Sequence, residues 1–329
     1  MNYLMCSAGR RCELLRYFQN SAEDGSHVVV TDNSIYAPAL YVVEKHYIVP
    51  KITVPGYIEK LLEICQKEKI NGIATLIDPE IEILAQHREK FKQNGVEVFV
   101  PDFKTAHICF DKYMMYQYLK AVGIPTVETW NTIDAYLASN KPFPVFVKPR
   151  LGSGSVGAMR INTLEQLENA FDRDPSLIIQ ELMVGLDLDA DVYVDTITHQ
   201  AVSAFLKRKL ETKIGGASKT VSFKDPALFS MIQDVVSQFR FSGPINMDFF
   251  YQNGMYYLSE INPRFGGGYI HTYRAGIDFI KMMEKNLHGQ CNTPVFGNYD
   301  EGSVMMMFDS AVFCKREELA NNMALQLCE

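Results

Sequence analysis

The residues with the clearest chemical potential lie close together between Met255 and Gly268. Side chains alternate between the two faces of a strand, so Glu260 and Asn262 should point the same way. Both offer hard oxygen atoms, which magnesium takes as ligands while it keeps several waters and bridges phosphates. Arg264 and three glycines follow, and glycines let a backbone approach a ligand closely. A buried structural Glu–Arg pair would use the same residues, but their clustering favours a magnesium and phosphate site.

A second carboxylate, Asp248, lies on the other arm of the hairpin that we predict around residues 253–254. A two-residue loop would pair residue 252 with residue 255 and set Asp248 opposite Ser259. A three-residue loop with a left-handed glycine would instead bring Asp248 and Glu260 onto one face. We therefore expect an odd-numbered loop and a shared metal site.

A second site is predicted around Lys148, which ends a strand and precedes a loop rich in glycine and serine that includes Gly152, Ser153 and Gly154. Backbone amides of such loops form anion-binding nests, and the lysine adds a point charge. The loop lacks the GKS or GKT ending of a P-loop, so it would be another kind of phosphate cover. Flexible linkers have a similar composition, yet the lysine beside the loop favours phosphate contact.

The first hundred residues alternate strand and helix patterns, which predicts a parallel sheet covered by helices. Ligands of such sheets bind at the carboxyl ends of the strands, here near Arg10, Arg11, Asp32 and Asp78. The two arginines could bind the carboxylate of a substrate, or they could simply be solvated at the start of a helix. No GxGxxG fingerprint follows the first strand, so a dinucleotide site is not expected.

Hydrophobic periodicity and turn residues divide the chain into three α/β segments with a cleft expected between them. In the first segment we expect strands at 2–7, 27–31, 72–76 and 96–100, and helices at 11–20, 55–69 and 80–94. In the second we expect strands at 144–148, 158–161 and 177–180, and helices at 111–122 and 164–172. In the third we expect strands at 189–197, 201–210, 245–251, 255–261 and 303–309, and a helix at 226–239.

The composition is that of a globular protein, with 47% hydrophobic and 22% charged residues among 329. The apolar runs are too short to span a membrane, and two early arginines argue against a secretory signal, so we expect a cytoplasmic chain. A net charge of −7 makes general nucleic-acid binding unexpected. Seven scattered cysteines show no metal-ligand spacing and are expected as free thiols. No membrane partner is expected, and a homodimer is the default assembly.

The order of the motifs resembles that of the ATP-grasp superfamily. The motifs are Lys112 at a helix start, Lys148 before the glycine loop, Gln180-Glu181-Leu182 at a strand end, and Glu260-x-Asn262. The nearest likeness is to the large chain of carbamoyl-phosphate synthase and its single-unit relatives, and it covers nearly the whole chain. The resemblance implies an α/β fold with α+β character in its ATP-grasp part. The implied parts are a Rossmann-like pre-ATP-grasp domain at 1–104, a small lid subdomain at 105–180 and a C-terminal subdomain with the metal site at 181–329.

The same resemblance implies roles for individual residues. ATP would be bound by Lys112, Lys148, Gly152, Ser153, Gly154, Gln180, Glu181, Leu182, Met183 and Asp187. Glu181 would accept a hydrogen bond from the adenine amino group, and Asp187 stands where relatives use a glutamate for the ribose. Magnesium, or manganese in its place, would be held by Asp248, Glu260 and Asn262. Catalysis would use Arg264, Arg208 and Lys213, the last two from a basic stretch that could instead be an exposed edge strand.

The implied function is that of an ATP-dependent ligase for a small carboxylate and an amine. The carboxylate would attack the γ-phosphate, and the amine would displace phosphate from the acyl phosphate that results. The candidate substrate residues are Arg10, Arg11, Tyr269 and Arg274. One alternative is a component like carbamoyl-phosphate synthase or a carboxylase that needs a partner subunit. Another is a non-catalytic ATP-binding regulator, which should lack the metal carboxylates.

Overall fold

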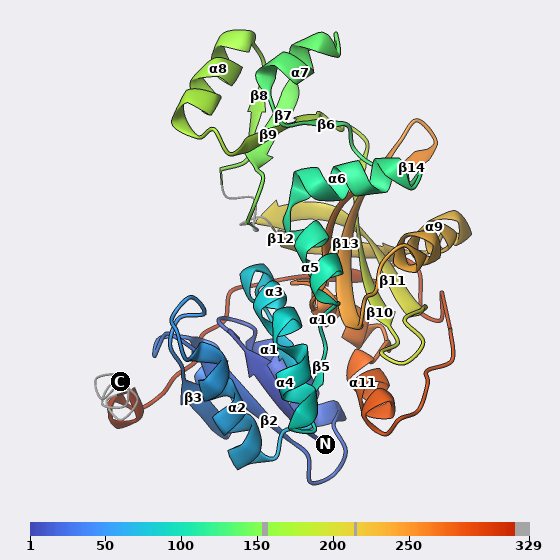
Figure 1. Cartoon of the computed structure of the whole chain (residues 1–329). Helices are drawn as coiled ribbons and strands as arrows, with labels where there is room; N and C mark the ends of the chain where they lie inside the picture. Colours follow the sequence, from blue (N-terminus) through green and yellow to red (C-terminus); the bar gives the residue numbers. More distant parts are fainter. Residues whose placement is uncertain (153–156, 214–215, 320–329) are drawn as a thin grey trace.

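The computed structural model describes residues 1–152, 157–213 and 216–319. The strands of these ranges form three sheets, each built from a different stretch of the sequence (Figure 1). A parallel sheet lies at one end, a small antiparallel sheet at the other, and a larger antiparallel sheet between them. Within these ranges no helix is long and apolar enough to cross a bilayer. The expected α/β fold class, with a parallel amino-terminal sheet, is confirmed.

The first sheet has the strand order β3-β2-β1-β4-β5, and its strands are parallel. The strands are β1 (Asn2–Cys6), β2 (His27–Asp32), β3 (Lys45–Ile48), β4 (Gly72–Thr75) and β5 (Glu97–Val98). The connecting helices are α1 (Cys12–Ser21), the 3-10 helix η1 (Pro38–Tyr41), α2 (Tyr57–Glu68), α3 (Asp78–Gln86) and α4 (Arg88–Gln93). The single helix expected over 80–94 is wrong, because it breaks at His87, whose Nδ1 turns back to the Ile83 carbonyl at 2.9 Å.

The second sheet is antiparallel, with the order β6-β9-β7-β8. Its strands are β6 (Thr129–Trp130), β7 (Val145–Pro149), β8 (Met159–Ile161) and β9 (Leu177–Glu181), and its helices are α7 (Ile133–Ala138) and α8 (Leu164–Arg173). Helix α8 begins where the Thr163 hydroxyl accepts from Gln166 N, and it buries Leu167 against the sheet. Together with Trp130 and Ile179, this leucine belongs to a small hydrophobic core of its own.

The third sheet is antiparallel and has the order β14-β13-β10-β11-β12-β15. Its strands are β10 (Leu186–Val194), β11 (Ala201–Lys213), β12 (Gly216–Phe223), β13 (Gly243–Gln252), β14 (Met255–Asn262) and β15 (Val304–Met306). The neighbouring helices are α5 (Phe103–Phe110), α6 (Lys112–Ala121), α9 (Pro226–Ser237), α10 (Tyr269–Arg274) and α11 (Phe279–Leu287). One face is apolar and packs against α5, α6 and α9. The other face carries polar side chains at alternate positions, as the two-residue period of a strand requires.

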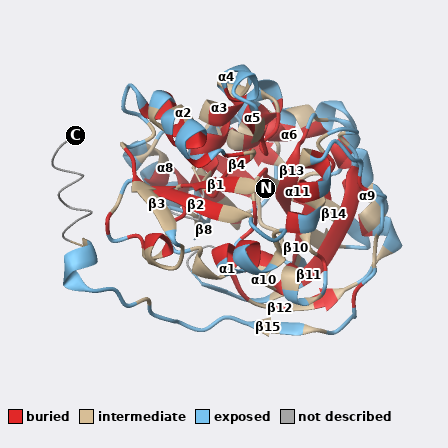
Figure 2. Ribbon diagram, turned by 90° about the horizontal axis from the view of Figure 1, so that it is seen from below, coloured by how far each residue is buried: buried red, intermediate tan, exposed pale blue. Residues whose placement is uncertain are grey.

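The first and third sheets share one hydrophobic core. Tyr3 and Phe18 from the first sheet and its helix α1 pack in the same cluster as Phe265, Tyr269 and Phe279. Figure 2 shows buried residues both in the first sheet and around α10 and α11, whereas the segment after β15 is exposed. The division of the chain at 104 and 180 stays a prediction; α5 and α6, which it assigns to the small subdomain, pack in the hydrophobic core of the third sheet.

We predict that Phe279→Ala lowers the free energy of unfolding by about 3–5 kcal/mol, because Phe279 is fully buried where the two sheets meet. Phe308→Ala is the matched control, since Phe308 is 86% exposed and its loss should change stability by less than about 0.5 kcal/mol. Urea unfolding followed by circular dichroism measures both values. A loss below about 1 kcal/mol for Phe279→Ala would contradict the shared core.

Candidate active site

The hairpin of β13 and β14 brings two carboxylates face to face by an unexpected route. Its loop has two residues, Asn253 and Gly254, both with positive φ, and Gln252 pairs with Met255. The odd-numbered loop that we expected is therefore wrong. A β-bulge in β14 supplies the missing shift.

In the bulge, Phe249 pairs with Leu258 but Asp248 pairs with Glu260, which leaves Ser259 as the extra residue. Residues directly opposite each other in an antiparallel pair project from the same face. Asp248 and Glu260 thus lie side by side, as a shared metal site requires. One inserted residue in the strand has the effect that we had assigned to the loop.

Asn262 follows on the same face and pairs across the strands with Asn246. Two carboxylates and an amide suit magnesium, which needs few protein ligands when phosphate oxygens and waters complete its shell. Among the described residues no group of three or more His, Cys, Asp or Glu side chains is placed to hold a metal ion. The donor set thus fits a metal that arrives with phosphates, and not one held in a closed protein cage.

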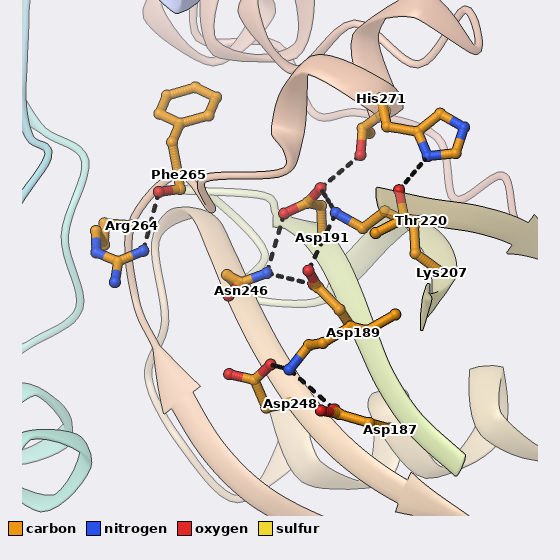
Figure 3. A network of polar contacts seen from close by, with 12 residues as sticks. Asp187, Asp189, Asp191, Lys207, Thr220, Asn246, Asp248, Arg264, Phe265 and His271 are labelled. Atoms are coloured by element: carbon orange, nitrogen blue, oxygen red, sulfur yellow. Dashed lines mark hydrogen bonds and ion pairs between the residues drawn. The ribbon is translucent and has the colours of Figure 1, made fainter. Parts of the chain in front are cut away.

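Lysine side chains lie next to both carboxylates. The Lys209 ammonium is 2.5 Å from Asp248 Oδ1 and 2.9 Å from Asp187 Oδ1 (Figure 3). Burial alone would lower the pKa of Lys209, but Asp248 and Asp187 raise it well above its usual value. On the other side, Lys148 Nζ is 3.8 Å from Glu260 Oε2. Burial, opposed by Glu260, lowers the pKa of Lys148.

A buried ion network lies next to these pairs on the same face. Lys207 has no exposed surface, and its Nζ is 2.5 Å from Asp191 Oδ2 and 3.5 Å from Asp189 Oδ2. Asn246 donates to Asp189 at 2.6 Å and to Asp191 at 3.1 Å, and the Thr272 hydroxyl donates to Asp191 at 2.5 Å. Burial raises the pKa of Asp189 to about 6, against the opposing charge of Lys207. The network joins β10, β11 and β13 to α10 (Figure 3).

The register of β11 does not support the catalytic role expected for Arg208. Arg208 pairs with Leu188 and Val221, so its side chain projects from the face opposite to that of Lys207 and Lys209. Strand parity relative to the aspartates of β10 was the signal in the sequence that would have selected these two lysines.

Lys213 does not contact the site in this structure either. It lies four residues beyond Lys209 along β11, where its exposed ammonium is 3.2 Å from Asp309 Oδ2. The catalytic assignment of Lys213 thus has no support in the observed contacts.

Arg264 connects the third sheet to the first. Its NH2 group is 2.9 Å from Asp78 Oδ2, at the start of α3, and its NH1 group donates to the Phe265 carbonyl at 3.0 Å. Arg11 lies nearby, because a Cβ added to Gly267 would be 3.4 Å from Arg11 NH1. Burial and the charge of Arg264 lower the pKa of Arg11 to about 10. Arg264 is ion-paired with Asp78, whereas Asp78 and Asp191 act on Arg11 through their charge. Two neighbouring guanidinium groups make this corner suitable for an anion.

Two of the predicted phosphate residues, Lys112 and Gly152, line a small pocket together with the predicted metal residues Glu260 and Asn262. Its lining also includes Asp78. The Lys112 ammonium donates to the Gly152 carbonyl, which ties the start of α6 to the glycine loop. The other two predicted loop residues, Ser153 and Gly154, lie outside the described residues.

A second hollow lies at the end of β9, where adenine was expected. It is lined by Trp130, Lys141, Pro142, Phe143, Pro144, Val145, Glu181 and Leu182. Lys141 is 3.5 Å from Glu181, and neither Lys141 nor the aromatic rings were predicted from the sequence. Gln180 is buried and donates to the Thr129 hydroxyl at 2.9 Å, so its amide supports the strand. Met183 follows Leu182 in the connection to β10 and is half-buried.

Two of the four candidate substrate residues, Tyr269 and Arg274, make their contacts away from Glu260. Tyr269 is buried in the shared core, and its hydroxyl accepts from Phe279 N at 2.9 Å. Arg274 is exposed and lies over the ring of Tyr17, 5.6 Å from its centroid. Arg10 is exposed at the start of α1. The helical turn of α10 directs Tyr269 to the shared core and Arg274 to Tyr17, and the sequence alone could not show how α10 docks.

Comparisons with known proteins agree with this geometry. A family described as "PylC-like, N-terminal domain" matches residues 3–99, and one described as "ATP-grasp in the biosynthetic pathway with Ter operon" matches residues 173–307. The L-arginine-specific L-amino acid ligase of Bacillus subtilis is 27% identical, over 84% of this chain and 72% of the ligase. The arginine-specific large chain of carbamoyl phosphate synthase from the same organism is 20% identical, over 64% of this chain and 22% of its own.

Two further similarities cover different shares of the chain. The vancomycin/teicoplanin A-type resistance protein VanA of Enterococcus faecium is 29% identical, but over only 31% of this chain and 32% of that protein. The chain therefore spans about a third of that relative's length. Among solved structures, the biotin carboxylase domain of Hydrogenobacter thermophilus 2-oxoglutarate carboxylase, a dimer with MgADP and bicarbonate, superposes with a TM-score of 0.72 at 17% identity. It covers 92% of this chain and 73% of that one, and it shows the fold alone.

Lys207→Met should lower the free energy of unfolding by about 3–5 kcal/mol, because two buried aspartates would lose their counter-charge. Lys213→Met, on the same strand but in an exposed pair, should cost less than about 1 kcal/mol. Guanidinium unfolding at neutral pH compares the two variants. If both variants lost the same free energy of unfolding, the buried network would contribute no more to stability than an exposed ion pair.

His271 should make stability depend on pH. Burial, followed by the charge of Lys207, lowers its pKa to about 4, so the folded chain keeps the imidazole neutral. The unfolded chain binds the proton near pH 6.5, and the free energy of unfolding should therefore fall as pH drops from about 6.5 towards 4.

The variant His271→Gln removes this titration, and its unfolding free energy should lose roughly 2 kcal/mol less than wild type between pH 7 and pH 5. Urea unfolding of both proteins at pH 7 and pH 5 gives the difference between them. Asp189 is present in both proteins, so its own titration cancels in that difference. An imidazole pKa above 6 in an NMR titration of His271 would contradict the prediction.

Proposed function

We propose, because the chain belongs to the ATP-grasp superfamily, that it is an ATP-dependent ligase that joins a small carboxylate to an amine through an acyl phosphate. The observation that carries this proposal is the pairing of Asp248 with Glu260 on one face of the bulged hairpin. Lys148 and Asn262 adjoin this pair, and the two arginines lie just beyond it.

Asp248, Glu260 and Asn262 would hold magnesium, for which manganese could substitute. The metal, when bound, offsets negative charge on the phosphates of ATP. Lys112 and Lys148 would bind phosphate oxygens, since Lys112 lines the pocket together with Glu260 and the Lys148 ammonium is 3.8 Å from Glu260 Oε2.

Adenine would lie in the hollow at the end of β9. Glu181 would accept from its amino group, and the backbone of Leu182 or Met183 would reach the ring edge. Asp187 would bind the ribose hydroxyls, although it is one methylene shorter than the glutamate that relatives use.

The substrate carboxylate would be bound by Arg11 and Arg264, two neighbouring guanidinium groups of which Arg264 is ion-paired with Asp78. A carboxylate oxygen attacks the γ-phosphorus of ATP, ADP leaves, and an acyl phosphate forms. The nitrogen of the amine then attacks the acyl carbon, and inorganic phosphate leaves as the C–N bond forms. Arg264 would also stabilise the transferring phosphoryl group, because it lies two residues after Asn262 in the chain.

Water would hydrolyse the acyl phosphate, so the site should close during the reaction. The second sheet would act as the lid, which its separate hydrophobic core supports. Its strand β7 carries Lys148, and the chain continues from there to Gly152 at the pocket.

A second candidate function is an ATP-dependent component that activates bicarbonate and works with a partner subunit. The similarity to a carbamoyl phosphate synthase chain and to a biotin carboxylase fold supports it. A non-catalytic ATP-binding regulator is disfavoured, because both metal carboxylates are present. A homodimer and a cytoplasmic location stay predictions.

The deciding experiment incubates the protein with magnesium, ATP and pooled amino acids, and follows ADP release and product masses. A new mass equal to two components minus water would establish the ligase. Bicarbonate-dependent ADP release without such a product would favour the second candidate function. ADP release in neither condition, despite ATP binding, would contradict both.

Glu260→Gln should lower ADP release by about 100-fold or more, because the amide removes one negative charge from the metal site. Glu59→Gln is the matched control, since Glu59 is an exposed surface residue paired with Lys90. Normal turnover by Glu260→Gln would show that the metal assignment is wrong.

A further inference from the structure

Lys209 has no role in the reaction described above, yet its ammonium rests on a carboxylate assigned to the metal. It lies 2.5 Å from Asp248 Oδ1 and 2.9 Å from Asp187 Oδ1. Within the described part of the chain, Lys209 is the residue with which both Asp187 and Asp248 form their ion pairs. A carboxylate oxygen that accepts from an ammonium is poorly placed to bind a divalent cation at the same time.

A comparison with Lys207 shows that Lys209 is built differently. The two lysines are two residues apart on β11, face the same side and each contact two aspartates. Lys207 is completely buried, and its partners also accept from Asn246 and Thr272. The Lys209 side chain is 15% exposed and that of Asp248 is 24% exposed, so this pair can be reached from solvent. Lys207 stabilises the sheet, whereas Lys209 can exchange its aspartate partners for another anion.

The charges around Lys209 give a reason for such an exchange. Asp187, Asp248 and Glu260 lie on three neighbouring strands and carry three negative charges on one accessible face. Without Lys209, Asp248 would be free beside Glu260, and these two facing carboxylates would attract a divalent cation more strongly than they do with the ammonium in place. Phosphates of ATP would offer the ammonium another anionic partner, which the four methylenes of a lysine allow it to reach.

We propose that Lys209 takes the place of the divalent cation while the nucleotide site is empty, and releases Asp248 to the metal when ATP binds. The consequence is that metal and nucleotide bind together and not one after the other. This inference rests on the proposed function, because it takes Asp248 and Glu260 as metal ligands. It adds a residue that sets the order of binding and that stood outside the predicted site.

Manganese binding tests the proposal without any turnover. Free Mn²⁺ is measured by electron paramagnetic resonance for wild type and for Lys209→Met, each with and without a non-hydrolysable ATP analogue. Wild type should bind Mn²⁺ weakly alone and much more tightly with the analogue. Lys209→Met should bind Mn²⁺ alone roughly tenfold or more tightly than wild type does, because the competing ammonium is gone.

Two control variants separate this effect from a general change in charge. Lys209→Arg keeps a cation on Asp248 and should behave like wild type. Lys90→Met removes a lysine from an exposed pair with Glu59, and should leave Mn²⁺ binding unchanged. Lys209→Gln provides a second test if the methionine variant does not give a native circular dichroism spectrum.

Two results would overturn the proposal. One is an Mn²⁺ affinity of Lys209→Met, without nucleotide, that stays within about twofold of wild type. The other is wild-type binding of Mn²⁺ that is equally tight with and without the analogue. A wild-type protein that binds the analogue but no Mn²⁺ would refute the metal site itself, and with it both the proposed function and this inference.

Discussion

The polar face of the third sheet depends on the buried ammonium of Lys207. A buried charge is costly unless its partners replace the water that it has lost, and here Asp189 and Asp191 do so. Asn246 and Thr272 satisfy the remaining oxygens of these aspartates, which draws β13 and α10 to the same point. The glycine run before α10 is positioned by this network.

Close packing against the network also explains why Gly266 has no side chain. A Cβ at that position would be 2.5 Å from Asp191 Oδ1 and 2.7 Å from Asn246 Nδ2. The backbone therefore passes directly over the buried ions, and Arg264, two residues earlier, reaches Asp78 of the first sheet. An electrostatic requirement inside one sheet thus fixes the meeting point of two sheets.

The sequence predicted most strands, and the common face of Glu260 and Asn262, because these depend on local patterns. Alternation placed Glu260 and Asn262 on one face, and periodicity located α1, α2, α6, α8 and α9 to within a few residues. The helices α5, α7, α10 and α11 were not predicted. The bulge at Ser259 was missed, since one inserted residue leaves no mark in hydrophobicity. The contact between Arg264 and Asp78 joins residues far apart in the chain, and only the docking of two sheets reveals it. Strand β12, which pairs with β11 at Arg208, was missed as well.

The shared core of the first and third sheets has a consequence for how such a chain can change over evolutionary time. The residues from about 129 to 181 pack mainly on themselves, whereas Phe18 and Phe279 lie in one core although they come from opposite ends of the sequence. Recombination could exchange the middle segment between relatives without disturbing that core. The two outer segments would have to be inherited as a matched pair, because neither can change its packing surface alone.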